Sequence, residues 1–161
     1  MVTGKAPTSP PGARPSIWPN ASDQVRYWSM CVNIGAGTDP VVVNHLPGGQ
    51  TDLGCRADDA TRLSAGGTYS YVIGTEAQRA IIERAAGVTF LPLSLDQPAA
   101  LYLLAMRFIL ANPTFDYAPQ NIVQTGSAAA ASQTMGAYYP HAQICALSAL
   151  SAEGASACGQ L

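Results

Sequence analysis

Four cysteines, at positions 31, 55, 145 and 158, restrict the fold of this chain more than any other feature. An even number permits two disulfide bonds, which can connect in three ways. No two cysteines follow the Cys-x-x-Cys spacing, which argues against a zinc site and against thioredoxin-like redox chemistry. Two interpretations stay open at this point: disulfide bonds, or a nucleophilic thiol at Cys31.

Length and charge exclude several classes of partner. The 161 residues fit one domain, which is long enough to bury most of its apolar surface. Charged residues make up only 11% and the net charge is −2, so there is no basic stripe and we expect no nucleic-acid partner. The longest apolar segment, 99–110, contains Arg107 and is too short for a spanning helix, so we expect no membrane span. No apolar signal-peptide core follows Met1.

Proline divides the chain into two parts. Residues 1–22 contain five prolines, which disfavour helices and central strands. We therefore predict an extended Pro-rich arm over 1–22. Residues 23–161 form the second part, a single β-rich domain with an Ala-rich C-terminal helix.

Period-two alternation predicts strands in the first half of the domain. In 25–32 the side chains alternate between two faces and are rich in aromatic and β-branched types. Residues 40–46 read as the next strand, and a hairpin between the two is the simplest interpretation, with 47–55 as a loop. Further strands are predicted at 68–75 and at 87–93, where Pro92 interrupts the pattern.

Helix signals appear twice. Thr75 and Gln78 have the spacing of a capping box and Gly87 has the place of a C-terminal cap, which predicts a helix over about 76–86. A second, Ala-rich helix is predicted over about 142–153. Residues 100–110 fit a buried strand or a buried helix equally well. The low-complexity segment 126–133 is expected to be mobile.

The order of these elements lacks a regular βαβ alternation, which disfavours a doubly wound sheet. The predicted fold is mainly β: an antiparallel sandwich or jelly-roll-like sheet with two small helices.

Several segments carry a family resemblance. The chain resembles a family of uncharacterised exported bacterial proteins, largely actinobacterial, and is similar to the jelly-roll-like C-terminal domain of envelope proteins of unknown function. The resemblance covers roughly residues 4–122, although Phe90 replaces the tryptophan that the family has before Leu-Pro, and family members carry more chain before the first motif. It implies export and a β core, but no catalytic residues. The motifs are GKAPTSP (4–10), QVRYWSMCVN (24–33), YSYVIGT (69–75), GVTFLPL (87–93) and MRFILANPTFDYAPQNI (106–122).

The same resemblance implies the disulfide pairing. In the family pattern the cysteine after RYWS pairs with one after the next strand, which here joins Cys31 to Cys55 and leaves Cys145 with Cys158. The first bond closes a loop of about 25 residues and would stabilise the fold by roughly 3 kcal/mol. The alternative, a catalytic Cys31 with His45 or His141 as base, lacks the cationic surroundings that lower a thiol pKa.

Three functions are compatible with these residues. The first is an exported, disulfide-stabilised ligand-binding or accessory domain whose partner is a small molecule or an envelope component; Tyr138, Tyr139 and His141 are its candidate ligand-binding residues. The second is a small hydrolase of esters or amides, with Ser127, His141 and Asp116 as candidate catalytic residues, although the G-x-S-x-G motif is absent. The third is a structural envelope module that forms a homo-oligomer.

We expect no cofactor and no metal site. His45, Asp52, Asp58 and Asp59 are the nearest approach to a mixed ligand set, and their spacing matches no known pattern. A solvated acidic loop explains them better.

Overall fold

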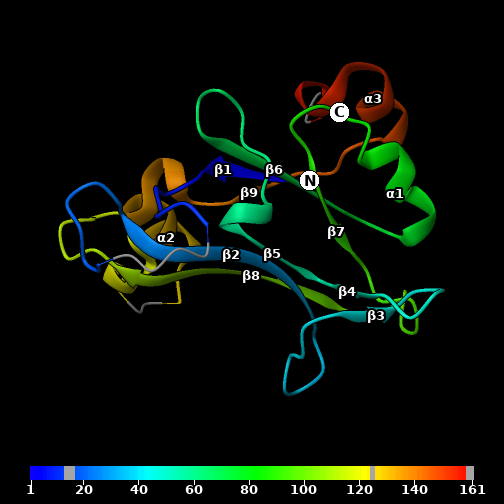
Figure 1. The fold of residues 1–161 in the computed structure, drawn as a ribbon, viewed down its shortest axis with the longest axis horizontal. Coiled ribbons are helices and arrows are strands. Elements are labelled where there is room, and N and C mark those ends of the chain that lie inside the picture. Colours follow the sequence, from blue (N-terminus) through cyan, green and yellow to red (C-terminus); the bar gives the residue numbers. More distant parts are fainter. Residues whose placement is uncertain (13–16, 124–125, 159–161) are drawn as a thin grey trace.

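The computed structural model describes residues 1–12, 17–123 and 126–158, and these residues form a mainly β structure with three short α-helices (Figure 1). One sheet is mixed, with the strand order β7-β6-β1-β9; a second is antiparallel, with the order β5-β2-β8; and β3 and β4 form a two-stranded ribbon. The strands are β1 (Val2–Lys5), β2 (Val25–Ile34), β3 (Val43–His45), β4 (Thr51–Leu53), β5 (Cys55–Ala57), β6 (Thr68–Gly74), β7 (Thr89–Pro92), β8 (Tyr102–Ala111) and β9 (His141–Ala142). The helices are α1 (Glu76–Ile82), α2 (Ala128–Met135) and α3 (Leu147–Glu153), with 3₁₀ turns η1 (Asp58–Ala60), η2 (Pro119–Asn121), η3 (Gly136–Tyr138) and η4 (Gly154–Ala157).

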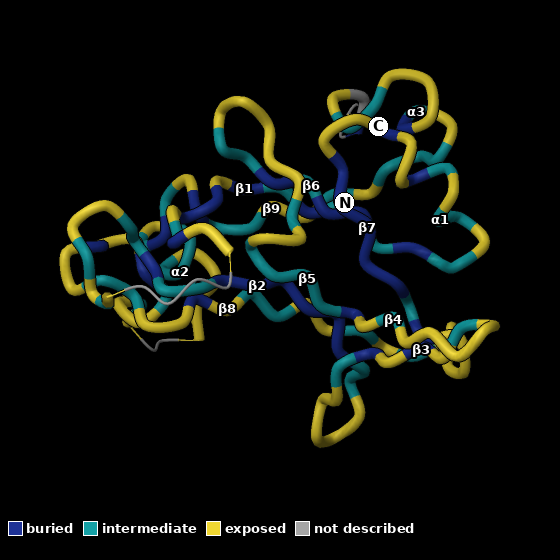
Figure 2. The backbone as a smooth tube through the Cα atoms, viewed as in Figure 1, coloured by how far each residue is buried: buried dark blue, intermediate teal, exposed yellow. Residues whose placement is uncertain are grey.

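The main core joins the two larger sheets. Trp28 of β2 lies with its ring centroid 5.7 Å from that of Tyr69 on β6, and Tyr69 lies 5.3 Å from Tyr71. All three side chains are buried, in the same cluster as Val2 and Leu91. Figure 2 shows the backbone of β7 and much of β2 in the colour of buried residues. A smaller cluster lies between α1, α3 and β7. The β-rich prediction is confirmed; the sandwich or jelly-roll arrangement stays a prediction.

The prediction that the first 22 residues contain no central strand is wrong. Val2–Lys5 forms β1, which pairs with β6 on one side and β9 on the other. These four residues precede the first proline, Pro7, so all of their N–H groups are available for pairing. The rest of the arm has no regular secondary structure up to residue 12, and its residues 13–16, including Pro15, lie outside the described part.

The predicted hairpin is present only as a short contact. The strand at 25–32 exists as β2, and its end pairs with 40–42 through one antiparallel bridge, Asn33 to Val41, with two backbone hydrogen bonds (2.8 and 3.0 Å). The longer neighbours of β2 are β5 and β8, and residues 43–45 pair with β4, which lies in the expected loop. The disulfide between Cys31 and Cys55 places β5 beside β2. The segment left open, 100–110, is strand β8, but the expected burial is wrong, since Phe108 is the one buried residue among those of this strand.

The helix predictions need three corrections. The capping box of Thr75 and Gln78 is present, but α1 ends at Ile82 and turns follow it to Gly87. The C-terminal helix begins at Leu147, since Gln143 exchanges two backbone hydrogen bonds with Met1 (2.7 and 2.9 Å) and so stays extended. Within the segment expected to be mobile, an alanine run of high helix propensity forms α2, with Ser127 as its N-cap.

A candidate binding groove

A concave surface lies between the Pro-rich segment 6–12 and η1. A cavity of about 420 Å³ is bounded by these two segments, with Asp23 and Trp28 also lining it. A second cavity of about 410 Å³ adjoins it and reaches Arg26 and Tyr27 on β2. Four residues line both cavities: Pro10, Gly12, Asp58 and Asp59. We call the combined surface the arm groove.

Hydrogen bonds hold the first wall of the arm groove in place. The N–H of Ala6 donates to Gly67 (2.9 Å), which ties the segment to the turn before β6. Two residues on, the Thr8 carbonyl accepts from the N–H groups of Gln24 and Val25 (both 3.0 Å), and the Thr8 N–H donates to the Gln24 side chain (3.0 Å). Proline restricts the backbone between and beyond these anchors, so the wall is preorganised.

The second wall depends on the first disulfide. Cys31 and Cys55 face each other on β2 and β5, and η1 follows β5 directly. Thr61 then secures the end of η1: its hydroxyl donates to Ala57 O (2.7 Å), so its oxygen accepts the proton of the Tyr71 hydroxyl (2.5 Å). Asp58 and Asp59 are thereby held at the edge of the groove.

The described residues that line the arm groove carry mainly negative charge. Asp23, Asp58 and Asp59 contribute carboxylates, and Arg26 is the one cation among them. Asp23 accepts a hydrogen bond from Asn20 (2.8 Å) and Asp58 accepts one from the Asp59 N–H (3.0 Å), while the exposed Asp59 carboxylate has no protein partner among the described residues. No group of three potential metal ligands occurs anywhere in the described chain. The arrangement suits a ligand that carries positive charge and some apolar surface.

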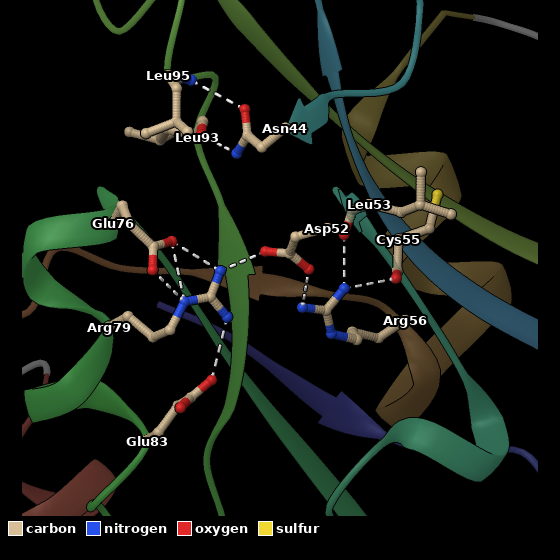
Figure 3. A network of polar contacts seen from close by, with 10 residues as sticks. All are labelled: Asn44, Asp52, Leu53, Cys55, Arg56, Glu76, Arg79, Glu83, Leu93 and Leu95. Atoms are coloured by element: carbon tan, nitrogen blue, oxygen red, sulfur yellow. Dashed lines mark hydrogen bonds and ion pairs between the residues drawn. The ribbon is translucent and has the colours of Figure 1, made fainter. Parts of the chain in front are cut away.

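A separate polar cluster connects β4 and β5 to α1 (Figure 3). Arg79 donates to both carboxylate oxygens of Glu76 (2.8 and 2.9 Å), to Glu83 (3.2 Å) and to Asp52, which also accepts from Arg56 (2.9 Å). The hydrogen bonds that Arg79 donates to Glu76, followed by those to Asp52, raise its pKa despite its partial burial. Its guanidinium also lies 4.3 Å from the centre of the Phe90 ring. Every charge is paired, so the cluster serves to hold elements together.

The candidate ligand-binding residues do not share one surface. Tyr138 is buried in the main core; its hydroxyl accepts from Gln24 Nε2 (2.9 Å), and its ring meets Phe115 edge-on at 5.0 Å. Tyr139 is partly buried, with its ring centroid 5.7 Å from that of His141, which is exposed on β9. Tyr139 and His141 are therefore together, and Tyr138 is not with them.

The candidate catalytic residues lie on separate elements. Ser127 accepts from the Ala130 N–H (3.4 Å) as the N-cap of α2. His141 lies on β9 opposite Thr3, and Asp116 lies in the loop before η2. No hydrogen bond or ion pair joins His141 to Asp116, both of which are described.

Sequence reasoning missed the arm groove and the Arg79 cluster for one reason. Both bring together segments that are far apart in the chain, 6–12 with 58–60 and Asp52 with Arg79. The prolines and the paired aspartates were visible in the sequence, but no local pattern indicates that they face each other.

Comparison with known proteins returned no match to a protein-family model, to a curated protein or to a solved structure. The family resemblance of residues 4–122 stays a prediction. None of the helices in the described residues has the length and apolar character that crossing a membrane requires.

Proposed function

We propose that this protein is an exported, disulfide-stabilised binding domain whose arm groove holds a positively charged small molecule. The observation that carries the proposal is the pair of adjoining cavities bordered by Asp58 and Asp59. A volume near 400 Å³ falls within the range of about 300–1,000 Å³ typical of small-molecule sites. Both walls are anchored by hydrogen bonds, so binding costs little ordering of the protein.

Charge supports the ligand class. Among the described lining residues, three carboxylates against one guanidinium attract a cation, and the Tyr27 side chain with the prolines offers apolar contact. A diamine such as putrescine is the simplest probe with both properties, and a neutral disaccharide is a suitable control for charge.

The test compares melting temperatures with and without putrescine. Mass action predicts a rise in Tm that grows with putrescine concentration for the wild type. The double variant Asp58→Asn/Asp59→Asn should lose most of the rise, while Asp96→Asn, which changes an exposed aspartate outside the groove, should keep it. A rise that is equal in all three proteins, or absent from the wild type, would remove the groove as the site.

Export rests on the cysteines. Two disulfide bonds, Cys31–Cys55 and Cys145–Cys158, indicate an oxidising environment, because such bonds persist outside the reducing cytosol. They use all four cysteines. A thiol titration of the denatured, unreduced protein isolated from its natural source should find no free thiol. Four reactive thiols would place the protein in a reducing compartment and end the export proposal.

A p-nitrophenyl ester assay separates this proposal from the hydrolase alternative. We expect no turnover above that of free imidazole at the same concentration. Turnover that is lost in Ser127→Ala and retained in Ser148→Ala, a serine in the unrelated helix α3, would favour the hydrolase instead.

A further inference from the structure

Strand β8 leaves one long side unpaired. It runs antiparallel to β2 in one register, without interruption from Tyr102 opposite Ile34 to Ile109 opposite Tyr27; the ladder skips Leu110, whose φ is +51°, and resumes with Ala111 opposite Val25. It is the last strand of the order β5-β2-β8 and has no second partner strand among the described residues. In Figure 1 it follows the lower border of the body beside β2.

The pairing of β2 shows which residues of β8 face outward. Gly35 N donates to Leu101 O (2.8 Å), whereas Val32 N and Ile34 N donate to Gly54 and Pro40 on the opposite side. Along an antiparallel strand, the backbone N–H and C=O groups of successive residues point alternately to one neighbouring strand and to the other. Odd-numbered residues of β2 therefore exchange hydrogen bonds with odd-numbered residues of β8. The N–H and C=O groups of Tyr102, Leu104 and Met106 consequently point away from β2.

A side chain limits the free edge at one end. Phe108 is the next residue of β8 whose backbone N–H and C=O groups point away from β2. Its carbonyl accepts a hydrogen bond from Gln120 Nε2 (3.0 Å). The edge open to a new strand therefore extends from Tyr102 to Met106, and Leu104 lies at its centre.

This open edge lacks the usual protection against pairing. Natural edge strands carry lysine, proline or bulges, or are very short. The ten residues of β8 have a single charge, Arg107, and no proline. Three leucines at or beside the open edge are solvent-exposed: Leu101 (72%), Leu103 (42%) and Leu104 (42%).

We propose that a second copy of this chain pairs with β8 through an antiparallel strand contact whose two-fold axis passes between the two Leu104 residues. Leu104 then faces Leu104 of the partner subunit, and Tyr102 faces Met106 of the partner subunit. These three hydrogen-bonded pairs, counted over both copies, use every open N–H and C=O group of the edge. The two antiparallel sheets join into one of six strands.

A second copy fits this edge for two reasons. The open stretch is centred on one residue, so a two-fold operation maps it onto itself and the capped Phe108 carbonyl stays outside the contact. Charge does not oppose the contact, because Arg107 faces the partner's Leu101 and each chain has a net charge of only −2. The arm groove lies beside β5, at the other edge of this sheet, so the contact is independent of the proposed ligand.

Sedimentation velocity over a range of concentrations tests the contact. The wild type should have twice the mass of one chain, Leu104→Lys should have the mass of one chain because two lysines would face each other, and both should show the same circular dichroism. Leu95→Lys is the matched control, since Leu95 has nearly the same exposure (43%) in a loop, and it should remain a dimer. A monomeric wild type at 100 µM, or a dimeric Leu104→Lys, would overturn the proposal.

Hydrogen exchange on the wild type tests the register without a substitution. The amides of Leu104 and Met106 should exchange slowly at concentrations where the dimer forms and faster on dilution. Fast exchange of both amides in a sample of dimer mass would place the contact elsewhere and overturn the proposal, whether or not Leu104→Lys folds.

Discussion

Gly4 and Tyr69 face each other across strands β1 and β6, and the tyrosine ring occupies the space where a side chain at position 4 would lie. A Cβ atom added to Gly4 would come within 2.8 Å of Tyr69 Cζ. The ring cannot move aside easily, because it is fully buried between Trp28 and Tyr71. The glycine of the GKAPTSP segment thus lets β1 pass close to the aromatic core.

Gly4→Ala should therefore destabilise the protein. We expect the free energy of unfolding to fall by about 1–3 kcal/mol, as for other overpacked cores. Urea denaturation followed by circular dichroism measures the change. Gly66→Ala is the control: its Cβ would have only Ser64 Oγ nearby, at 3.8 Å, so its effect should be much smaller. Equal stability of Gly4→Ala and the wild type would contradict this account of the core.

Arg79→Ala should weaken the connection between α1 and the β4–β5 segment. The variant loses the hydrogen bonds to Glu76, Asp52 and Glu83 and the contact with Phe90, so we expect a loss of about 2 kcal/mol. Arg79→Lys should recover less than half of the free energy of unfolding that Arg79→Ala loses, since an ammonium group cannot reproduce the planar arrangement of guanidinium donors. Arg84→Ala, an exposed arginine on the same segment, should stay within about 0.5 kcal/mol of the wild type in the same denaturation experiment. If Arg79→Ala and Arg84→Ala lowered the free energy of unfolding by similar amounts, the Arg79 cluster would not stabilise the fold as described.

Alkaline pH should unfold the protein through two tyrosines. Burial raises the pKa of both Tyr69 and Tyr71 well above the value of about 10 for an exposed phenol, and the neighbouring phenol raises that of Tyr69 further. The folded state keeps these two protons where the unfolded state releases them. Their contribution to stability is complete below pH 10 and is lost as the pH rises above it.

Tyrosinate absorbance and circular dichroism, recorded together during a base titration, check this expectation. The tyrosinate absorbance of Tyr69 and Tyr71 should appear only when the protein unfolds. Tyr69→Phe should reduce the slope of stability against pH above pH 10. Ionisation of all seven tyrosines in the folded protein would refute the assignment.

Sequence predicted the elements whose signals are local. The Thr75–Gln78 capping box identified the start of α1, and the alternation of 25–32 identified β2, because both patterns depend on near neighbours. Strand pairing was predicted only in part: the connection to 40–46 gives a single bridge, and the long partner of β2 is β8, about 70 residues further along the chain. The period-two alternation of a strand does not identify its partner strand, because the contacts between them join residues far apart in the chain.

The candidate site shows the same limit. The Pro-rich segment and the Asp58–Asp59 pair were each visible, but the arm groove exists only because backbone hydrogen bonds at Ala6 and Thr8 bring the segment beside η1. Tyr138 was expected at a binding surface because GAYYPHA looks exposed; the structure instead buries its ring against Phe115.

A ¹⁵N–¹H NMR titration of the wild type with putrescine is the first measurement to make on the proposed cation site in the arm groove. We expect saturable shifts that are largest at Thr8, Ser9, Asp58 and Asp59 and that disappear in Asp58→Asn/Asp59→Asn. The absence of saturable shifts, or shifts centred on Tyr139 and His141, would rule out the arm groove as the site.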